Sequence, residues 1–139
     1  MAHWLMKSEA DTWSWTHQVA AGAKGTGWDG VRNHQAKAHL KAMKAGDTAL
    51  FYHSGDERAV VGIMEIVGTY VPDPSDEKGI FGMVQVSARD PLLHPVTLAA
   101  VKTNAALKDM VLVKNSRLSV QPVTAAEWKA VLAMAKAPS

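Results

Sequence analysis

Apolar residues along the chain follow two spacing patterns, and the first of them predicts strands. Short runs of β-branched, aromatic and other apolar residues are separated by turn residues, and in one run Val84 and Val86 alternate with Gln85 and Ser87. Such runs are typical of strands that are buried on one or both faces. The predicted strands cover residues 3–8, 48–53, 59–70, 81–88 and 118–122.

The second pattern has a period near 3.6 residues and predicts helices. Within residues 32–44, Ala36, Leu40 and Met43 are spaced i, i+4 and i+7, which places them on one face of a helix. The final segment starts with the capping box TAAE and continues the helical spacing over Trp128, Val131, Leu132 and Ala135. Shorter helical segments are predicted at 14–22 after an N-cap serine, from Thr97 onward, and at 105–110.

The order of these elements predicts an α+β fold. Strands gather in the middle of the chain and helices at its beginning and end, without regular strand–helix–strand repeats. We expect a small, curved sheet or a partly open β-barrel flanked by helices. A chain of 139 residues with no internal repeat and no long linker is also expected to form a single domain, residues 1–139, around one core.

The composition and the first residues of the chain exclude some kinds of site and predict its location. The chain has no cysteine, which excludes a disulfide framework, a thiolate zinc site and a cysteine nucleophile. The first residues, MAHWLMKSEAD, carry charges where a signal peptide needs apolar residues, and no stretch approaches the roughly 18 apolar residues of a membrane helix. A net charge of +2 does not by itself indicate nucleic acid. We therefore expect a soluble, cytoplasmic protein with no membrane association.

No sequence pattern predicts catalysis, a cofactor or a metal. His53 and Ser54 are adjacent, but FYHSGD lacks the nucleophile-elbow pattern, and neighbouring strand residues point to opposite faces. The stretch GAKGTG lacks the Lys-Ser/Thr pair of a phosphate-binding loop. His34 and His39 are five residues apart, which misses the i, i+4 spacing of two ligands on one helix face. We expect no catalytic residue, cofactor or metal, although an enzyme stays an alternative.

Two surface features have more than one interpretation. Trp28 lies in a glycine-flanked turn ahead of a helix, where its indole could be a partly exposed stacking surface or could anchor the loop to the core. Lys37, Lys41 and Lys44 repeat at helical spacing, which is typical of a solvated helix face and also suits contact with phosphates. Periodicity leaves both alternatives open in each case.

Six ordered blocks that span nearly the whole chain resemble the EVE domain family. The blocks are HWLMKSEAD, WDGVRNHQAKAHLKAMKAGD, FYHS, VVGIMEIV, YVPDP and RLSVQPVTAAEW. The resemblance implies a PUA-like fold related to the YTH readers of methylated adenine, with a pocket for a modified base and modified cytosine in DNA as the favoured ligand. One departure is Ala10, where the family usually has a proline after MKSE, and this change loosens the turn after the first strand.

The same resemblance implies roles for individual residues. Trp28 matches the cage tryptophan of the related YTH readers and is expected to stack on a base that has left the duplex. Arg32 has two alternatives, a place beside the base or a structural ion pair with Asp29 or Glu9. The polar residues expected around the base are Lys7, Ser8, Asp29, Asn33 and Arg32.

Further contacts are implied at the edges of this pocket. His53 and Ser54 are expected to form another wall, with a satisfied core histidine as the alternative. Arg117 matches the place where YTH proteins hold a phosphate, a role that suits the fixed fork of donors on a guanidinium. Lys37 and Lys41 are expected to add backbone contacts.

The function implied is therefore a monomeric, non-catalytic reader of a modified base in nucleic acid. The alternative is a small nucleotide-processing enzyme or an RNA-binding module on a PUA-like barrel, because fold alone does not fix function. If Trp28 is an exposed stacking surface, its replacement is expected to cost less stability than replacement of Trp128 in the last helix.

Overall fold

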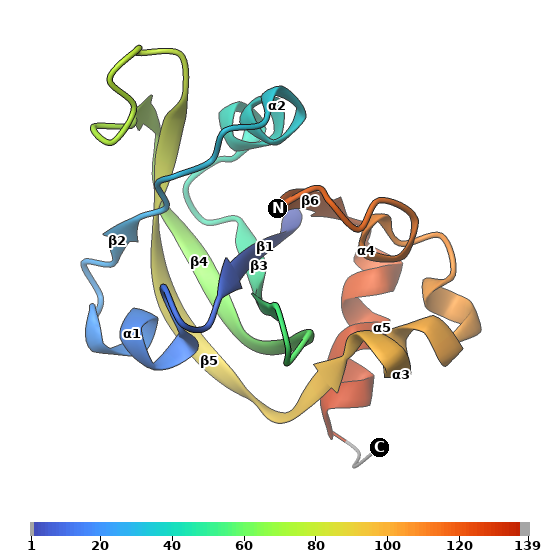
Figure 1. Cartoon of the computed structure of the whole chain (residues 1–139). Coiled ribbons are helices and arrows are strands. Elements are labelled where there is room, and N and C mark those ends of the chain that lie inside the picture. Colours follow the sequence, from blue (N-terminus) through green and yellow to red (C-terminus); the bar gives the residue numbers. More distant parts are fainter. Residues whose placement is uncertain (1, 137–139) are drawn as a thin grey trace.

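The computed structural model describes residues 2–136 and is built around one six-stranded mixed sheet (Figure 1). The strand order is β2-β5-β4-β3-β1-β6, and the sheet is open because β2 and β6 form its two edges. Only the pairing of β1 with β3 is parallel, and the other pairings are antiparallel. The strands are β1 (His3–Glu9), β2 (Thr26–Gly27), β3 (Thr48–Ser54), β4 (Ala59–Pro72), β5 (Gly82–Thr97) and β6 (Val120–Val123).

Helices cover the sheet on both sides. In Figure 1 the C-terminal helices gather on one side of the sheet, whereas α1 lies near β2 and α2 lies near β6. The predicted α+β class is thus confirmed. None of the helices within residues 2–136 has the length and apolar character needed to cross a membrane. The helices are α1 (Trp15–Ala20), α2 (His34–Ala42), α3 (Leu98–Thr103), the 3-10 helix η1 (Ala105–Leu107), α4 (Val111–Lys114) and α5 (Ala125–Lys136).

The buried residues form two clusters, where the sequence had predicted one core. Along β1, Trp4 and Met6 join the first cluster, and Leu5 between them joins the second. The same alternation on β3 places Phe51 in the first cluster and Leu50 in the second. The central strands are therefore buried on both faces, and the two clusters lie on the two sides of one sheet.

The hairpin of β4 and β5 is much longer than the sequence predicted. β5 continues through Pro91 and Pro95, which sequence rules would place at the end of a strand. The register shifts here, because Val60 opposes Val96 but Gly62 opposes Pro91. Pro95 therefore lies in a bulge of residues 92–95 that leaves the ladder, and Pro91 lies at the border of this bulge. We call the far end of this hairpin, residues 67–83, the arm.

The short strand β2 was missed, because its sequence reads as a glycine-rich loop. Thr26 and Gly27 pair with Val86 and Gln85 of β5. Gly25 makes the pairing possible: its φ is +73°, and a Cβ atom there would lie 2.0 Å from the carbonyl oxygen of Val86. This pairing attaches the segment before Trp28 to the sheet.

Candidate functional site

A cavity of about 260 Å³ opens where the end of β1 meets the segment around β2. Its size is just below the ~300–1,000 Å³ of pockets for drug-sized ligands, so it suits one small ring. It is lined by Lys7, Ser8, Thr12, Trp13, Thr26, Gly27, Trp28 and Asp29. Four of the residues predicted from the sequence, Lys7, Ser8, Trp28 and Asp29, are thus brought together.

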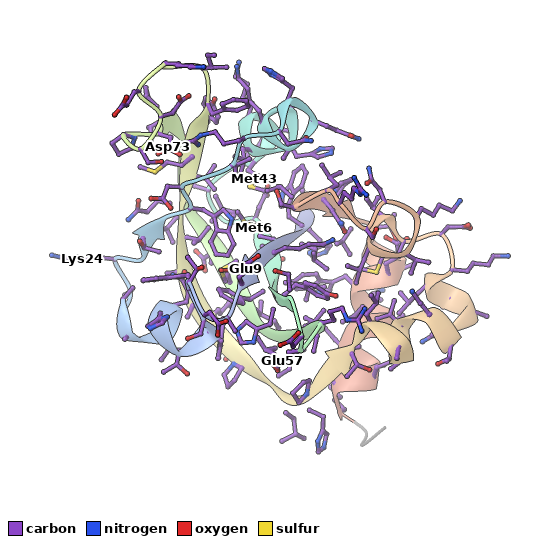
Figure 2. The ribbon with its side chains drawn as sticks, viewed as in Figure 1. Met6, Glu9, Lys24, Met43, Glu57 and Asp73 are labelled. Atoms are coloured by element: carbon purple, nitrogen blue, oxygen red, sulfur yellow. The ribbon has the colours of Figure 1, made fainter. Side chains whose placement is uncertain are left out.

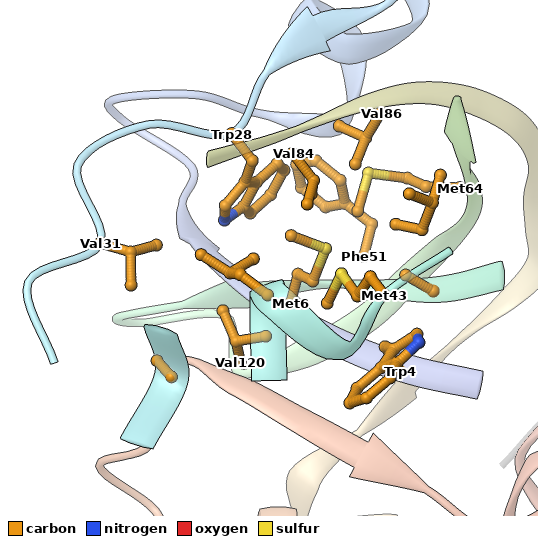
Figure 3. Close-up of a cluster of buried hydrophobic side chains, with 14 of the residues drawn as sticks. Trp4, Met6, Trp28, Val31, Met43, Phe51, Met64, Val84, Val86 and Val120 are labelled. Carbon is orange, nitrogen blue, oxygen red and sulfur yellow. The ribbon is translucent and has the colours of Figure 1, made fainter. Parts of the chain in front are cut away.

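Trp28 is both a wall of this cavity and part of the core. Its side chain is only 7% exposed, and its ring meets Phe51 edge-on with the centroids 5.4 Å apart. Figure 3 shows Trp28 beside Phe51 and Val84 in the first cluster, and its backbone N–H donates to the Val84 carbonyl at 2.8 Å. The prediction of a partly exposed indole is therefore wrong, because the ring anchors its loop to the core while one part of it borders the cavity.

Trp13 provides a second indole, which the sequence analysis did not assign to the site. The backbone N–H groups of Thr12 and Trp13 both donate to the Glu9 carbonyl, so the chain turns back immediately after β1. The Trp13 ring is half-buried, and its Nε1–H donates to Gln18 Oε1 at 2.8 Å. Gln18 is itself fixed by a bond from its Nε2 to the Val86 carbonyl. The only local signal for this wall was the proximity of Trp13 to the first strand.

The polar groups of the cavity differ in whether they already make hydrogen bonds within the protein. Ser8 Oγ donates to the Trp13 carbonyl at 2.6 Å, so its proton is already used to hold the turn. Lys7 Nζ donates to the Ser116 carbonyl at 2.6 Å, and burial lowers the pKa of this ammonium group below its ordinary value. Asp29 is exposed, and its carboxylate makes no hydrogen bond with other groups of residues 2–136. Asp29 is therefore the acceptor best placed to meet a ligand.

Lys7 also connects the cavity to the turn that carries Arg117. Besides the contact of its Nζ with Ser116, its backbone N–H donates to the Ser119 carbonyl at 2.9 Å. Gln121 holds the same turn from β6, through its Nε2 and the Leu118 carbonyl at 2.8 Å. Arg117 is exposed and does not line the cavity, but its turn is bonded to a residue that does.

Arg32 and Asn33 support the site from outside the cavity. Arg32 forms an ion pair at 3.1 Å with Asp73 on the arm, rather than with Asp29 or Glu9. Asn33 is the N-cap of α2, because its Oδ1 accepts from the backbone N–H of Ala36 at 2.9 Å. Neither side chain lines the cavity.

Asp73 is the buried acceptor to which this segment is attached. Burial raises its pKa, but hydrogen bonds from the Ser75 hydroxyl, the Gly30 and Ser75 backbone N–H groups and the Arg32 guanidinium outweigh burial and lower the pKa to about 2. The carboxylate is therefore ionised at neutral pH. In Figure 2 Asp73 lies on the arm, while Lys24, ahead of β2, projects away from the molecule.

His53 and Ser54 lie beside the end of β1 but do not line the cavity. His53 Nε2 accepts the backbone N–H of Trp15 at 3.0 Å, so Nδ1 carries the proton and donates to Glu57 at 2.6 Å. His53 is thus a satisfied buried residue that holds the start of α1, which was the alternative interpretation. No hydrogen bond joins the Ser54 hydroxyl to the His53 ring in the described part of the chain.

Lys37 and Lys41 face the arm rather than the cavity. Lys37 Nζ lies 5.8 Å from the ring centre of Phe81, and Lys41 Nζ lies 5.6 Å from that of Tyr70. At these distances each ammonium group makes a cation–π contact that helps to hold the arm against α2.

Known proteins are similar to this chain in sequence and in fold. The model of the EVE domain family matches residues 2–134. Thymocyte nuclear protein 1 of Homo sapiens is 36% identical, over 96% of this chain and 73% of that protein.

Solved structures agree closely with this chain. Rpa0253 from Rhodopseudomonas palustris, solved by NMR, is 55% identical with a TM-score of 0.92, over 98% of this chain and 94% of that one. The human THYN1 protein, crystallised in complex with 5-methylcytosine-containing DNA, is 35% identical with a TM-score of 0.90, over 100% of both chains. A ZmASCH protein from Zymomonas mobilis is 7% identical with a TM-score of 0.63, which shows a similar fold alone. The open sheet flanked by helices is the predicted PUA-like fold, and since the family model covers nearly all of the described residues, the chain belongs to the EVE domain family.

Proposed function

We propose that this protein binds nucleic acid that carries a modified cytosine and holds that base in the cavity bordered by Trp13 and Trp28. The observation that carries the proposal is that two indoles and an exposed carboxylate border one cavity of single-ring size. A base that leaves a duplex needs a stacking surface and partners for its polar edge. Each stacked base contributes about 1–3 kcal/mol of binding free energy.

Asp29 accounts for a preference for cytosine. An ionised carboxylate accepts from the exocyclic amine of cytosine, and thymine offers an oxygen at that position instead of a donor. Support also comes from the human THYN1 protein, whose crystal structure contains 5-methylcytosine DNA and which is 35% identical to this chain.

Arg117 is the proposed phosphate contact. Its turn is bonded to Lys7, so a phosphate next to the bound base lies within the range of a side chain fixed relative to the cavity. Lys37 and Lys41 are weaker candidates, because both ammonium groups already contact rings of the arm.

We further propose that the protein is a reader and not an enzyme. The cavity contains hydroxyl groups and one exposed carboxylate, but neither histidine nor cysteine lines it. A hydroxyl nucleophile needs a general base that accepts its proton within hydrogen-bond distance, whereas here Ser8 Oγ donates to the Trp13 carbonyl and Lys7 Nζ donates to the Ser116 carbonyl. The monomeric state and the cytoplasmic location stay predictions. Because relatives are named thymocyte nuclear protein 1, a test of location should compare the cytoplasm with the nucleus.

The test compares oligonucleotides that differ only in one cytosine, which is plain, 5-methylated or 5-hydroxymethylated, with methylated adenine as a further arm. We expect tighter binding to a modified cytosine by fluorescence anisotropy, and unchanged nucleosides by mass spectrometry after long incubation. Asp29→Ala should weaken that binding about tenfold, the loss of one charge-assisted hydrogen bond. Asp56→Ala is the matched control, because Asp56 is also an exposed acid but lies in the β3–β4 turn. Equal binding of plain and modified cytosine, or an Asp29→Ala variant that binds like the native protein, would overturn the proposal.

A further inference from the structure

The arm reaches the candidate site through one buried carboxylate. Asp73 is 2% exposed, and its carboxylate accepts hydrogen bonds from the arm and from the segment that follows Trp28. Oδ1 accepts from the Ser75 backbone N–H and from Ser75 Oγ, both at 2.7 Å. Oδ2 accepts from the Gly30 backbone N–H at 2.9 Å and from Arg32 Nη1 at 3.1 Å. One oxygen therefore fixes the arm's own turn, and the other fixes the segment that follows Trp28.

That segment depends on attachment at both ends. The backbone N–H of Trp28 is held by Val84 of β5, which fixes the side nearer to β2. On the other side, Gly30 has a φ of +80°, a conformation that other residues rarely adopt, and its N–H points to Asp73. Trp28 and Asp29, two residues of the cavity wall, thus lie between an anchor on β5 and an anchor on the arm.

We propose that Asp73 is a positioning residue of the base site, which sets the place of Trp28 and Asp29 by holding Gly30 and Arg32. The proposal rests on the proposed function, since it assigns the arm a task in binding the base. Arg32 then connects the two segments: its Nη1 donates to Asp73 and to the Val31 carbonyl, and its Nη2 donates to Ser75 Oγ at 3.0 Å.

The chemistry of the carboxylate predicts that a neutral residue would not make the same contacts. Each oxygen accepts two hydrogen bonds, and the amide nitrogen of an asparagine accepts none. Asp73→Asn keeps the shape of the side chain and weakens the hold on Gly30 in either orientation, because its amide nitrogen cannot accept from Gly30 and its neutral oxygen accepts more weakly than a carboxylate. The lowered pKa of Asp73 agrees with this arrangement, because the same four bonds favour the ionised form.

Asp76 in the arm's loop provides a matched control. Its carboxylate also accepts several backbone bonds, from Lys78, Ile80 and Phe81, but it bonds to no residue of the 28–33 segment. Asp76→Asn therefore disturbs the arm to a similar extent and leaves the attachment of Gly30 in place.

The experiment measures three quantities for the native protein, Asp73→Asn and Asp76→Asn. In Asp73→Asn we expect faster hydrogen exchange at Gly30, about tenfold weaker binding of a 5-methylcytosine oligonucleotide, and an unchanged slope of affinity against salt, because Asp73 holds no phosphate. Asp76→Asn should exchange at Gly30 and bind like the native protein. If Asp73→Asn fails to fold, Ser75→Ala removes two side-chain bonds of the same junction and should produce the same changes at smaller size.

The outcomes separate this inference from the proposed function. If the native protein binds no modified oligonucleotide, the proposed function fails, while exchange at Gly30 still reports whether Asp73 holds the segment. If the native protein binds but Asp73→Asn binds equally well, or Asp76→Asn is weakened as much, the positioning role is wrong. A change of melting temperature without any change in exchange at Gly30 also contradicts it.

Discussion

Replacement of Trp28 by alanine is the most informative single perturbation, because the structure places this ring in the core and in the cavity wall. The indole is 7% exposed and packs edge-on against Phe51. Truncation of a buried aromatic residue to alanine costs about 3–5 kcal/mol, in which the loss of an aromatic pair is included at about 0.5–1.5 kcal/mol. This loss is a large part of the 5–15 kcal/mol that stabilises a typical domain.

Trp128 is the natural comparison, and here the structure reverses the expectation from sequence. Its ring is only half-buried on α5 and stacks on His3 with the centroids 4.3 Å apart. Water can fill part of the space that alanine would leave, so we expect Trp128→Ala to cost about 1.5–3 kcal/mol, close to a transfer contribution without a full cavity. Trp28→Ala should therefore be the more damaging of the two variants.

Urea unfolding followed by far-ultraviolet circular dichroism measures both losses without relying on tryptophan fluorescence. A third variant, Trp28→Phe, keeps an aromatic ring in the wall and should lose about 1–2 kcal/mol, since it deletes only part of the side chain. If Trp28→Ala retains more stability than Trp128→Ala, the Trp28 ring is not a core residue in solution, and its contact with Phe51 contributes less to stability than we expect.

Three further predictions concern charge and backbone geometry. The pKa of Asp73 falls on folding from its ordinary 3.8 to about 2. Its contribution to the free energy of unfolding, about 2 kcal/mol, is therefore present above pH 4 and is lost as the pH falls toward 2. Between pH 5 and pH 2.5, urea unfolding should show a smaller loss of stability for Asp73→Asn than for the native protein. Arg117→Ala should weaken binding to every oligonucleotide and flatten the slope of affinity against salt by about one phosphate contact, whereas an unchanged slope would leave Arg117 without a phosphate. Gly25→Ala should cost well over 1 kcal/mol by thermal unfolding, because its Cβ would meet the Val86 carbonyl at 2.0 Å in a φ region that alanine avoids; a native melting temperature would contradict the described pairing of β2.

Local signals in the sequence were sufficient for the elements whose ends are fixed by their own residues. Ser14 forms the capping box of α1 with His17, and Thr124 forms that of α5 with Glu127. The alternation of Val84 and Val86 with more polar neighbours also predicted a strand with one buried side. The capping contacts join residues three apart, so a short window of sequence contains all of their chemistry.

Features that depend on distant segments were not predictable in this way. β2 is a strand only because β5 lies beside it, and Arg32 found its partner 41 residues away in Asp73 instead of in nearby acids. The second indole of the cavity, Trp13, is placed by a turn after β1 and by Gln18, which in turn is held by Val86 of β5. Each of these positions is decided by the packing of the sheet, which hydrophobic spacing alone does not encode.

Because core side chains form part of the cavity wall, ligand affinity and folding stability depend on the same residues. The part of the Trp28 ring that borders the cavity and the part that packs on Phe51 belong to one rigid ring, so a substitution there is expected to change affinity and folding together. A ligand that binds only the folded chain adds stability of RT ln(1 + [L]/Kd), about 2.7 kcal/mol at a hundred times Kd. A modified oligonucleotide at that concentration should therefore raise the melting temperature of the native protein and of Asp56→Ala equally, but that of Asp29→Ala less. This comparison isolates the loss at the base edge, because Asp29 is exposed and leaves the anchored ring untouched.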